Sequence, residues 1–236
     1  MIRRPEIQKI VNNYNDFRIG VLGSHSALEI MDGAKDEGLD TIVFCQKGRE
    51  TPYQRFDRIA DEIKIVKKFS EMSSATNQKM LRDTNTIIVP HRSLTAYLGY
   101  NVIENSLKVP IFGNRALFQA EERNNKKNQY YLLKKARIKY PKIFKNPTDI
   151  NRPSIVKVQE KKRKLERAFF TVSSFSDYKK KSESKIKQGI ISKSDLKEAV
   201  IEQLAIGTYL NFNYFHTPIS KNVDFLGIER RLQTNI

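Results

Sequence analysis

The chain has 236 residues, of which 39% are hydrophobic, so it is long enough to form one large domain or two small ones. Its 43 Lys and Arg against 26 Asp and Glu give a formal net charge of +17, which favours anionic partners such as nucleotides, phosphorylated metabolites or nucleic acid. A single cysteine excludes an internal disulfide framework, and the lack of a signal-peptide core or of an apolar run of roughly 20 residues leads us to expect a soluble, cytoplasmic protein without a membrane partner.

Short apolar runs alternate with helical patterns in the first half of the chain. An amphipathic helix is expected over 5–15, and further helices over 77–83, over 97–107 and from about Ala27 to Gly38. Strands are expected at 18–22, 40–45, 61–66, 86–90 and 109–112. This alternation predicts a parallel α/β sheet, with 61–66 at an edge.

The segment 18–30 is predicted to be a strand, a tight turn and the start of a helix. Gly23 supplies the turn, and the hydroxyl of Ser24 or Ser26 can cap the helix. Because the free amides and the dipole of the helix point at it, such a turn is suited to binding an anion. His25 lies in the same turn, where an exposed imidazole and a ligand contact are equally open interpretations.

Ligands of open parallel sheets bind beyond the carboxyl ends of the strands. Polar and basic side chains follow three of the predicted strands, and they should therefore share one rim: Ser24, His25, Ser26, Gln46, Lys47, Arg49, His91, Arg92 and Ser93. Among them, Ser93 is a hydroxyl in a predicted loop, 91–93, beside two potential cations.

The pattern changes in the second half of the chain. A long helix is expected from Asn114 to about Ala136, either continuous or broken near Asn124 and Asn125. A linker that Pro141 and Pro147 mark follows it. Strands joined by short loops, and hence antiparallel, are expected at 154–159, 168–173, 199–205, 208–215 and 223–229, with a helix over 176–187. The predicted layout is an α/β domain, residues 1–120, followed by an α+β portion, residues 121–236.

Three features of the second half suit a nucleotide. Lys157 in an apolar strand is either an edge residue with its amine in water or a lysine that contacts the phosphates of a nucleotide. The basic run 161–167 is either a solvated hairpin loop or a flap over polyphosphate. Glu202 and Gln203 precede Gly207, where the chain either hinges past an adenine or simply ends a strand.

Taken in order along the chain, these segments resemble one family. The resemblance lies in residues 23–28, 43–49, 90–93, 97–100, 109–115, 146–153, 156–157, 166–170, 201–207, 214–215, 225–231 and 234–235. The family is that of the archaeal, formate-dependent synthetases of 5-formaminoimidazole-4-carboxamide ribonucleotide (FAICAR), which are ATP-grasp ligases. The resemblance implies an N-terminal parallel α/β domain that binds a ribotide, residues 1–120, and an ATP-grasp domain, residues 121–236, incomplete at its carboxyl end.

The resemblance also implies a reaction. ATP phosphorylates formate, and the amino group of aminoimidazole carboxamide ribotide (AICAR) attacks the formyl phosphate, giving FAICAR, ADP and phosphate in purine (IMP) biosynthesis. The implied AICAR contacts are His25, Ser26, Ser93 and Asn235, and the implied ATP contacts are Lys157, Arg167, Glu202 and Gln203. Mg²⁺ or Mn²⁺ is implied as well, with ligands expected beyond Ile236, and a homo-oligomer is expected.

This sequence departs from the family pattern at two points. Ala168 stands where the family usually has Gly in the flap strand, and the chain stops at Ile236, where family members continue. We therefore expect residues 1–236 to bind the ribotide without turning it over. Two other hypotheses stay open: a basic nucleic-acid-binding module, although the chain lacks an aromatic stacking platform, and a catalytically inactive ribotide-binding fragment.

Overall fold

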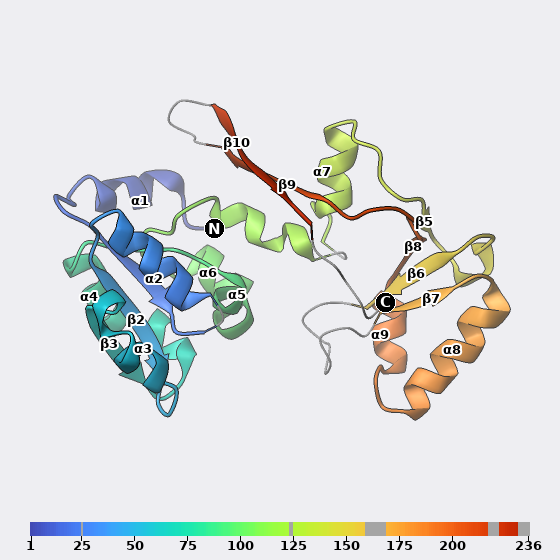
Figure 1. Ribbon diagram of the computed structural model, residues 1–236, viewed down its shortest axis with the longest axis horizontal. Coiled ribbons are helices and arrows are strands. Elements are labelled where there is room, and N and C mark those ends of the chain that lie inside the picture. The colour runs from blue at the N-terminus through green and yellow to red at the C-terminus, as the bar shows by residue number, and fades with distance from the viewer. Residues whose placement is uncertain (25, 123–124, 159–168, 217–221, 231–236) are drawn as a thin grey trace. The chain divides into compact units, whose positions relative to one another are not determined.

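The computed structural model describes residues 1–24, 26–122, 125–158, 169–216 and 222–230. The chain divides into two compact units, Met1–Gln119 and Ala120–Ile236, and each is described by itself (Figure 1). Among the helices of the described segments, none combines the length and the hydropathy that crossing a membrane requires.

A four-stranded parallel sheet forms the centre of the first unit. Its strands are β1 (Arg18–Leu22), β2 (Thr41–Gln46), β3 (Glu62–Val66) and β4 (Thr86–Ile88), in the order β3-β2-β1-β4. This confirms the predicted parallel α/β class and the edge position of β3. The strand expected at 109–112 is reduced to one parallel bridge between Ile111 and Ile88.

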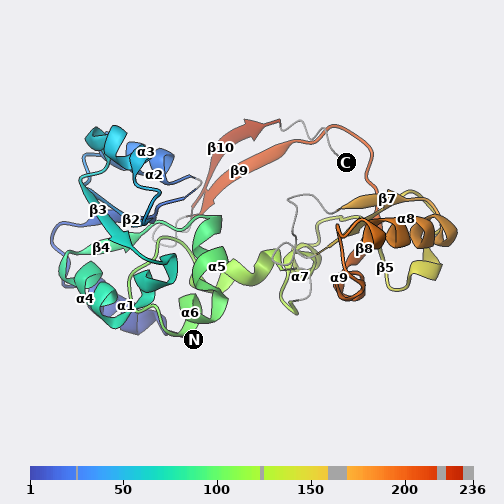
Figure 2. The same ribbon diagram turned by 90° about the horizontal axis from the view of Figure 1, so that it is seen from below.

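Helices cover both faces of this sheet. They are α1 (Arg4–Val11), α2 (Ala27–Asp36), α3 (Thr51–Arg55), α4 (Ala75–Asp83), α5 (Arg92–Leu98) and α6 (Tyr100–Asn105), with 3-10 turns at Asp57–Ile59, Phe69–Ser73 and Arg115–Glu121. Figure 2 shows α2 and α3 on one side of the sheet and α4 and α5 on the other.

Successive residues of β2 point into two separate cores. Val43 and Cys45 pack in one cluster with Met31 of α2, whereas Phe44 packs in the other cluster with Leu94 of α5. Because both faces are buried, β2 is a continuous apolar run rather than an alternating one, which is typical of parallel sheets covered by helices.

Two predicted helices differ from the structure. The helix expected over 97–107 is interrupted at Gly99, whose φ of 79° separates α5 from α6, and α5 itself begins at Arg92 in the predicted loop. The helix expected from Asn114 to about Ala136 is not continuous: the 3-10 turn Arg115–Glu121 precedes the expected break near Asn124 and Asn125, and α7 (Gln129–Lys135) follows it.

The second unit contains an antiparallel sheet, as predicted from its short loops. Its strands are β5 (Ile143–Phe144), β6 (Ser154–Lys157), β7 (Phe170–Val172) and β8 (Val200–Gln203), in the order β5-β8-β6-β7. Helices α8 (Phe175–Lys187) and α9 (Lys193–Glu198) and the 3-10 turn Pro147–Asp149 accompany the sheet. The linker expected between Pro141 and Pro147 is wrong in one respect, because it contains β5, which pairs with β8.

A separate two-stranded antiparallel sheet consists of β9 (Asn211–His216) and β10 (Val223–Glu229). Cross-strand partners share a face of such a sheet. One face therefore carries the apolar pairs Phe212–Ile228 and Tyr214–Phe225, and these four side chains are exposed.

Candidate functional site

The order of the strands marks one place in the first sheet for a ligand. From β1 the chain moves outward through β2 to β3, and then returns to the other side of β1 to form β4. Between β1 and β4 the direction of winding reverses, and in open α/β sheets ligands bind at such a switch point, beyond the carboxyl ends of the strands. The segments that follow β1 and β4 there are 23–26 and 89–93, both part of the predicted rim.

The turn after β1 is held close to β2. The Gly23 N–H donates to the Phe44 carbonyl at 2.7 Å, and a Cβ on Gly23 would lie 3.0 Å from that oxygen and 3.2 Å from the Cys45 Cα. A side chain at position 23 would therefore push the strands apart, as the predicted need for glycine implies. Helix α2 begins at Ala27, shortly after this turn.

Ser26 occupies the N-cap position of α2, but its hydroxyl makes no capping hydrogen bond, so the predicted cap by this side chain is wrong. The first-turn amides of α2 are thus not satisfied by the Ser26 side chain, and α2, with ten residues, keeps a positive helix end at the rim. His25, the other predicted contact in this turn, lies outside the described residues.

Two hydrogen bonds hold the segment after β4. The His91 Nε2 lies 2.9 Å from the Leu22 carbonyl of β1, and the Ser93 N–H donates to the His91 Nδ1 at 3.3 Å. Ser93 is buried, with 9% of its surface exposed, in the first turn of α5. Both ring nitrogens of His91 thus contact backbone groups of the two segments that form the rim.

The segment after β2 directs its arginine toward aromatic rings. The Arg49 Nη1 donates to the Tyr97 hydroxyl at 3.4 Å, and its guanidinium carbon lies 5.7 Å from the centre of the Phe69 ring. This contact orients Arg49 along the side of the sheet that α5 covers. Beside it, the Glu50 Oε2 is buried and has no hydrogen-bond partner within the described part of the chain.

The second unit brings two of its predicted site residues together. β6 lies between β8 and β7, so the interpretation of Lys157 as an edge residue is wrong. The Lys157 Nζ forms an ion pair with the Glu202 Oε1 across the neighbouring strands β6 and β8. The Tyr130 hydroxyl of α7 donates to the Glu202 Oε2 at 2.5 Å.

Both oxygens of the Glu202 carboxylate thus have a partner, and only 6% of this side chain is exposed, against 22% for Lys157. A buried carboxylate is stable when its charge is paired and its oxygens are hydrogen-bonded. Tyr130 was not predicted, and no local pattern marks it. Gln203 ends β8 and donates its N–H to the Lys142 carbonyl at 2.8 Å, whereas Arg167, Asn235 and Ala168 lie outside the described residues.

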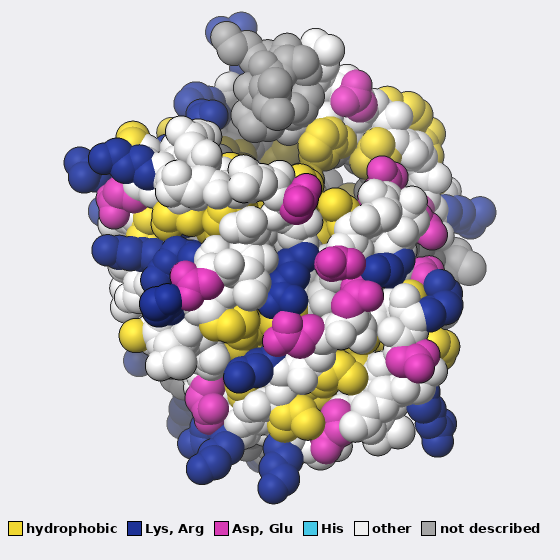
Figure 3. All heavy atoms as spheres, turned by 90° about the vertical axis from the view of Figure 1, so that its left-hand side faces the viewer, with side chains coloured by type: hydrophobic (Ala, Val, Ile, Leu, Met, Phe, Trp, Pro, Cys, Tyr) yellow, Lys and Arg dark blue, Asp and Glu magenta, His cyan; other side chains and the backbone are white. Residues whose placement is uncertain are grey.

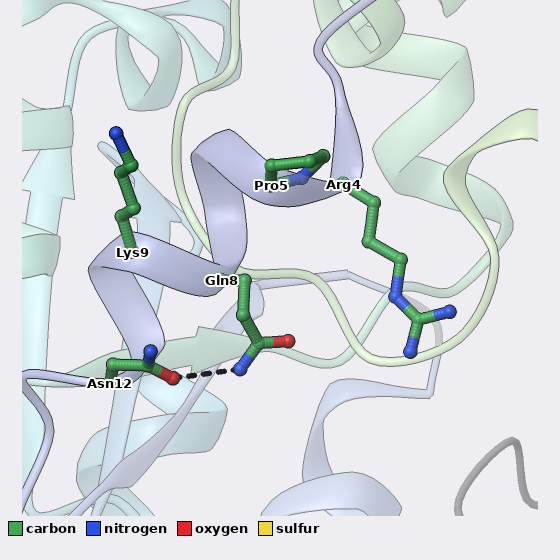
Figure 4. A pocket seen from close by; sticks show the side chains of 5 residues that line it. All are labelled: Arg4, Pro5, Gln8, Lys9 and Asn12. Carbon is green, nitrogen blue, oxygen red and sulfur yellow. Dashed lines mark hydrogen bonds between the residues drawn. The ribbon is translucent and has the colours of Figure 1, made fainter.

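Other surfaces of the described residues are less suited to chemistry. A surface pocket on α1 is lined by Arg4, Pro5, Gln8, Lys9 and Asn12, where the Gln8 Nε2 donates to the Asn12 Oδ1 at 2.8 Å (Figure 4). Its lining contains no carboxylate, hydroxyl or thiol. On the face drawn in Figure 3, Lys and Arg side chains are interspersed with Asp and Glu, so this face offers no continuous basic surface to a nucleic acid. No group of three or more His, Cys, Asp or Glu that could hold a metal ion occurs in the described segments.

Two family models match the sequence. The model described as a protein of unknown function (DUF1246) matches residues 19–144, and the model described as a domain of unknown function (DUF1297) matches residues 177–236.

Curated relatives match the chain from end to end. It is 42% identical over 238 residues to a 5-formaminoimidazole-4-carboxamide-1-(beta)-D-ribofuranosyl 5'-monophosphate synthetase of Methanopyrus kandleri, and 38% identical to the protein of the same name from Methanocaldococcus jannaschii. Each alignment covers 100% of this chain but only 65% and 64%, respectively, of the relative's length. The resemblance noted from the motifs is thereby confirmed.

Solved structures share the fold. An IMP biosynthesis protein PurP from Thermococcus kodakaraensis is similar with a TM-score of 0.62 at 22% identity, over 92% of this chain and 60% of that one. An N5-carboxyaminoimidazole ribonucleotide synthetase from Thermotoga maritima is similar with a TM-score of 0.59 at 14% identity, over 90% and 52%. The predicted ATP-grasp architecture, with a parallel α/β domain first, is thereby confirmed.

Proposed function

Because the chain belongs to the DUF1246 family and matches archaeal FAICAR synthetases along its whole length, we propose that it serves the ATP- and formate-dependent formylation of AICAR to FAICAR in purine biosynthesis. In this reaction ATP phosphorylates formate, and the amino group of AICAR displaces phosphate from the formyl phosphate. The reaction is a C–N ligation that releases ADP and phosphate. The relatives that are named for this activity are longer than this chain. The activity is therefore proposed for this chain.

The observation that carries the proposal is the rim between β1 and β4. The N-terminus of α2 lies at the carboxyl end of β1, and Ser93 in the first turn of α5 follows the end of β4. Backbone N–H groups and a positive helix end suit the phosphate of a ribotide. We assign Ser26 and Ser93 to AICAR, together with His25 and Asn235, which lie outside the described residues.

The pair of Lys157 and Glu202 supports the assignment of ATP to the second unit. An ammonium has three N–H donors, so Lys157 can donate to a phosphate oxygen while Glu202 holds its position. Glu202 and Gln203 end β8, where we assign the adenine, and Arg167, outside the described residues, is assigned to the phosphates. The chain's own residues contribute orientation and positive charge, which supply most of the catalysis in phosphoryl transfer.

A divalent cation, Mg²⁺ or Mn²⁺, would neutralise the charge that develops on the phosphates. The described residues do not fit such a site, because they contain no cluster of three metal-ligating side chains. We therefore assign the cation no ligand and no step.

Binding tests the proposal directly. Calorimetry should show that the chain binds AICAR, and that it binds the matching riboside, which lacks the phosphate, far more weakly. Ser93→Ala keeps the Ser93 N–H and removes only the hydroxyl, so AICAR binding should fall about tenfold, while ATP binding should stay unchanged.

For the ATP site the matched variants are Lys157→Met and Lys145→Met, since Lys145 is exposed in the same unit. Only Lys157→Met should lower ATP affinity. Equal affinity for AICAR and its riboside, or no AICAR binding at all, would refute the proposed function.

A further inference from the structure

The ring of His91 joins the two segments that form the rim. Its Nε2 contacts the last carbonyl of β1, at Leu22, at 2.9 Å, and its Nδ1 accepts the backbone N–H of Ser93 at 3.3 Å. The two partners are 71 residues apart in the sequence, since the chain passes through β2 and β3 between them. One rigid side chain therefore spans the place where the winding of the sheet reverses.

These partners determine the state of the ring. The Ser93 N–H can only donate, so the His91 Nδ1 must accept and carries no proton. The Leu22 carbonyl can only accept, so the proton lies on Nε2. Both contacts exist together only in the neutral imidazole with the proton on Nε2.

We propose that His91 is the positioning residue of the ribotide site, which sets the separation between the α2 end of the rim and Ser93. The inference rests on the proposed function in that the ligand is a ribotide. Ser24 and Ser26 follow Leu22 within four residues, and Ser93 follows His91 by two, so a shift at either contact moves a ligand-binding group. Binding that depends on several groups at once is sensitive to displacements of about 1 Å.

Two substitutions separate the two contacts of the ring. In His91→Asn, the side-chain oxygen can accept the Ser93 N–H, and Asn is a favourable N-cap residue, but the group is too short to reach Leu22. In His91→Gln, the amide nitrogen can donate to the Leu22 carbonyl, but the N-cap bond is lost. His91→Ala removes both.

The experiment measures AICAR affinity, ATP affinity and thermal stability for all three variants of the 236-residue chain. His91→Asn should keep the stability of the parent and yet lose roughly tenfold in AICAR affinity, and His91→Gln, in which the Ser93 end of the bridge is broken, should lose a similar factor. His91→Ala should lose at least as much as His91→Asn, and ATP affinity should not change in any variant, because the ATP residues lie in the other unit. Parent-like AICAR binding by His91→Asn, or an equal loss for ATP, would overturn the proposal.

If the parent chain binds no AICAR, that result refutes the proposed function alone. An NMR measurement then still tests the two contacts of His91. The ¹⁵N spectrum of the histidine rings, assigned by comparison with His91→Gln, should show a neutral ring with the proton on Nε2 near neutral pH. A protonated His91, or the tautomer with the proton on Nδ1, would overturn the bridge itself.

Discussion

Arg115 lies in the first unit as a partly buried cation that donates hydrogen bonds to carbonyl groups. Its Nη1 donates to the Leu107 carbonyl at 2.9 Å and also to that of Ile103, and its Nη2 donates to the Val109 carbonyl at 2.8 Å. Burial lowers the pKa of its guanidinium. The fork of N–H groups thereby fixes the end of α6 against the segment that pairs with β4.

Removing this fork should destabilise the chain. In Arg115→Met three carbonyls lose their donor, and the free energy of unfolding should fall by roughly 2 kcal/mol or more. Urea unfolding measures the change. Arg3→Met provides the control, because Arg3 is exposed and its ion pair with Glu6 is screened by solvent. Equal losses in both variants would contradict the structural role of Arg115.

Asp61 should make stability depend on pH. Burial alone would raise the pKa of its carboxyl, but hydrogen bonds from the Lys35 Nζ and from the Thr41 N–H outweigh burial and hold the pKa below its usual value of 3.8. A group whose pKa is lowered by folding stabilises the native state above its unfolded pKa, and this contribution is lost as the pH falls through the folded pKa.

The difference in unfolding free energy between the parent and Asp61→Asn should therefore be present at about pH 6, at roughly 1 kcal/mol for a partly exposed pair, and should shrink on acidification below the unfolded pKa. Denaturant titrations at about pH 6 and at a pH below the unfolded pKa measure this difference. Asp16→Asn, at an exposed aspartate, is the matched control and should show no such change. A difference that grows on acidification would contradict the assignment.

The contacts that sequence analysis did not predict are those between residues distant along the chain. Tyr130 and Glu202 are 72 residues apart, and His91 and Leu22 are 69 apart. A hydrophobic period reports neighbours within a helix or a strand, and it carries no information on such pairs. The rim was predictable because the carboxyl ends of parallel strands meet at one edge of a sheet, but the state of His91 on that rim was not.

At the scale of elements, the approach of β1 to β4 depends on Gly20. A Cβ there would lie 2.5 Å from the Thr86 Cγ2. Thr86 is fully buried, and its hydroxyl is held by the Arg18 Nε at 3.2 Å and by Thr84, so its side chain cannot turn away without losing these bonds.

Gly20→Ala should accordingly destabilise the chain by about 1–3 kcal/mol, the usual cost of overpacking a core. Gly33→Ala is its counterpart, since Gly33 lies within α2 with no atom within 4 Å of a new Cβ. The latter should stabilise by about 0.5–1 kcal/mol, because alanine is the better helix former. Thermal unfolding compares the two, and a shift of the same sign in both would contradict the packing described here.

Elements with a clear apolar pattern were predictable. The strands β1 and β2 are apolar runs because both of their faces are covered, and α8 has thirteen residues of helical pattern. By contrast, α3 has five residues, too few for a helical period, and α5 and α6 share one apolar pattern that the positive φ of Gly99 divides. At Gly99 the backbone conformation of one residue ends the helix, although the apolar pattern continues.

At the scale of the whole chain, the first unit should fold by itself. Its two buried clusters contain residues 19–109 only, and its parallel sheet is formed entirely by strands that precede residue 89. The Ile2 N–H also ties the chain start to the Glu104 carbonyl at 2.7 Å, and the Arg115 fork holds the other end. Every residue of these two clusters therefore belongs to the first unit.

We therefore expect residues 1–119 to unfold in one cooperative transition and to bind AICAR, with lower affinity than the chain of 236 residues because Asn235 is missing. ATP binding should be absent, since Lys157 and Glu202 belong to the second unit. Circular dichroism during heating and calorimetry with each ligand test these points, and Ser93→Ala in the fragment is the control for binding at the rim. A fragment that lacks a cooperative transition would refute independent folding, and one that folds but binds ATP as the whole chain does would refute the separation of the two sites.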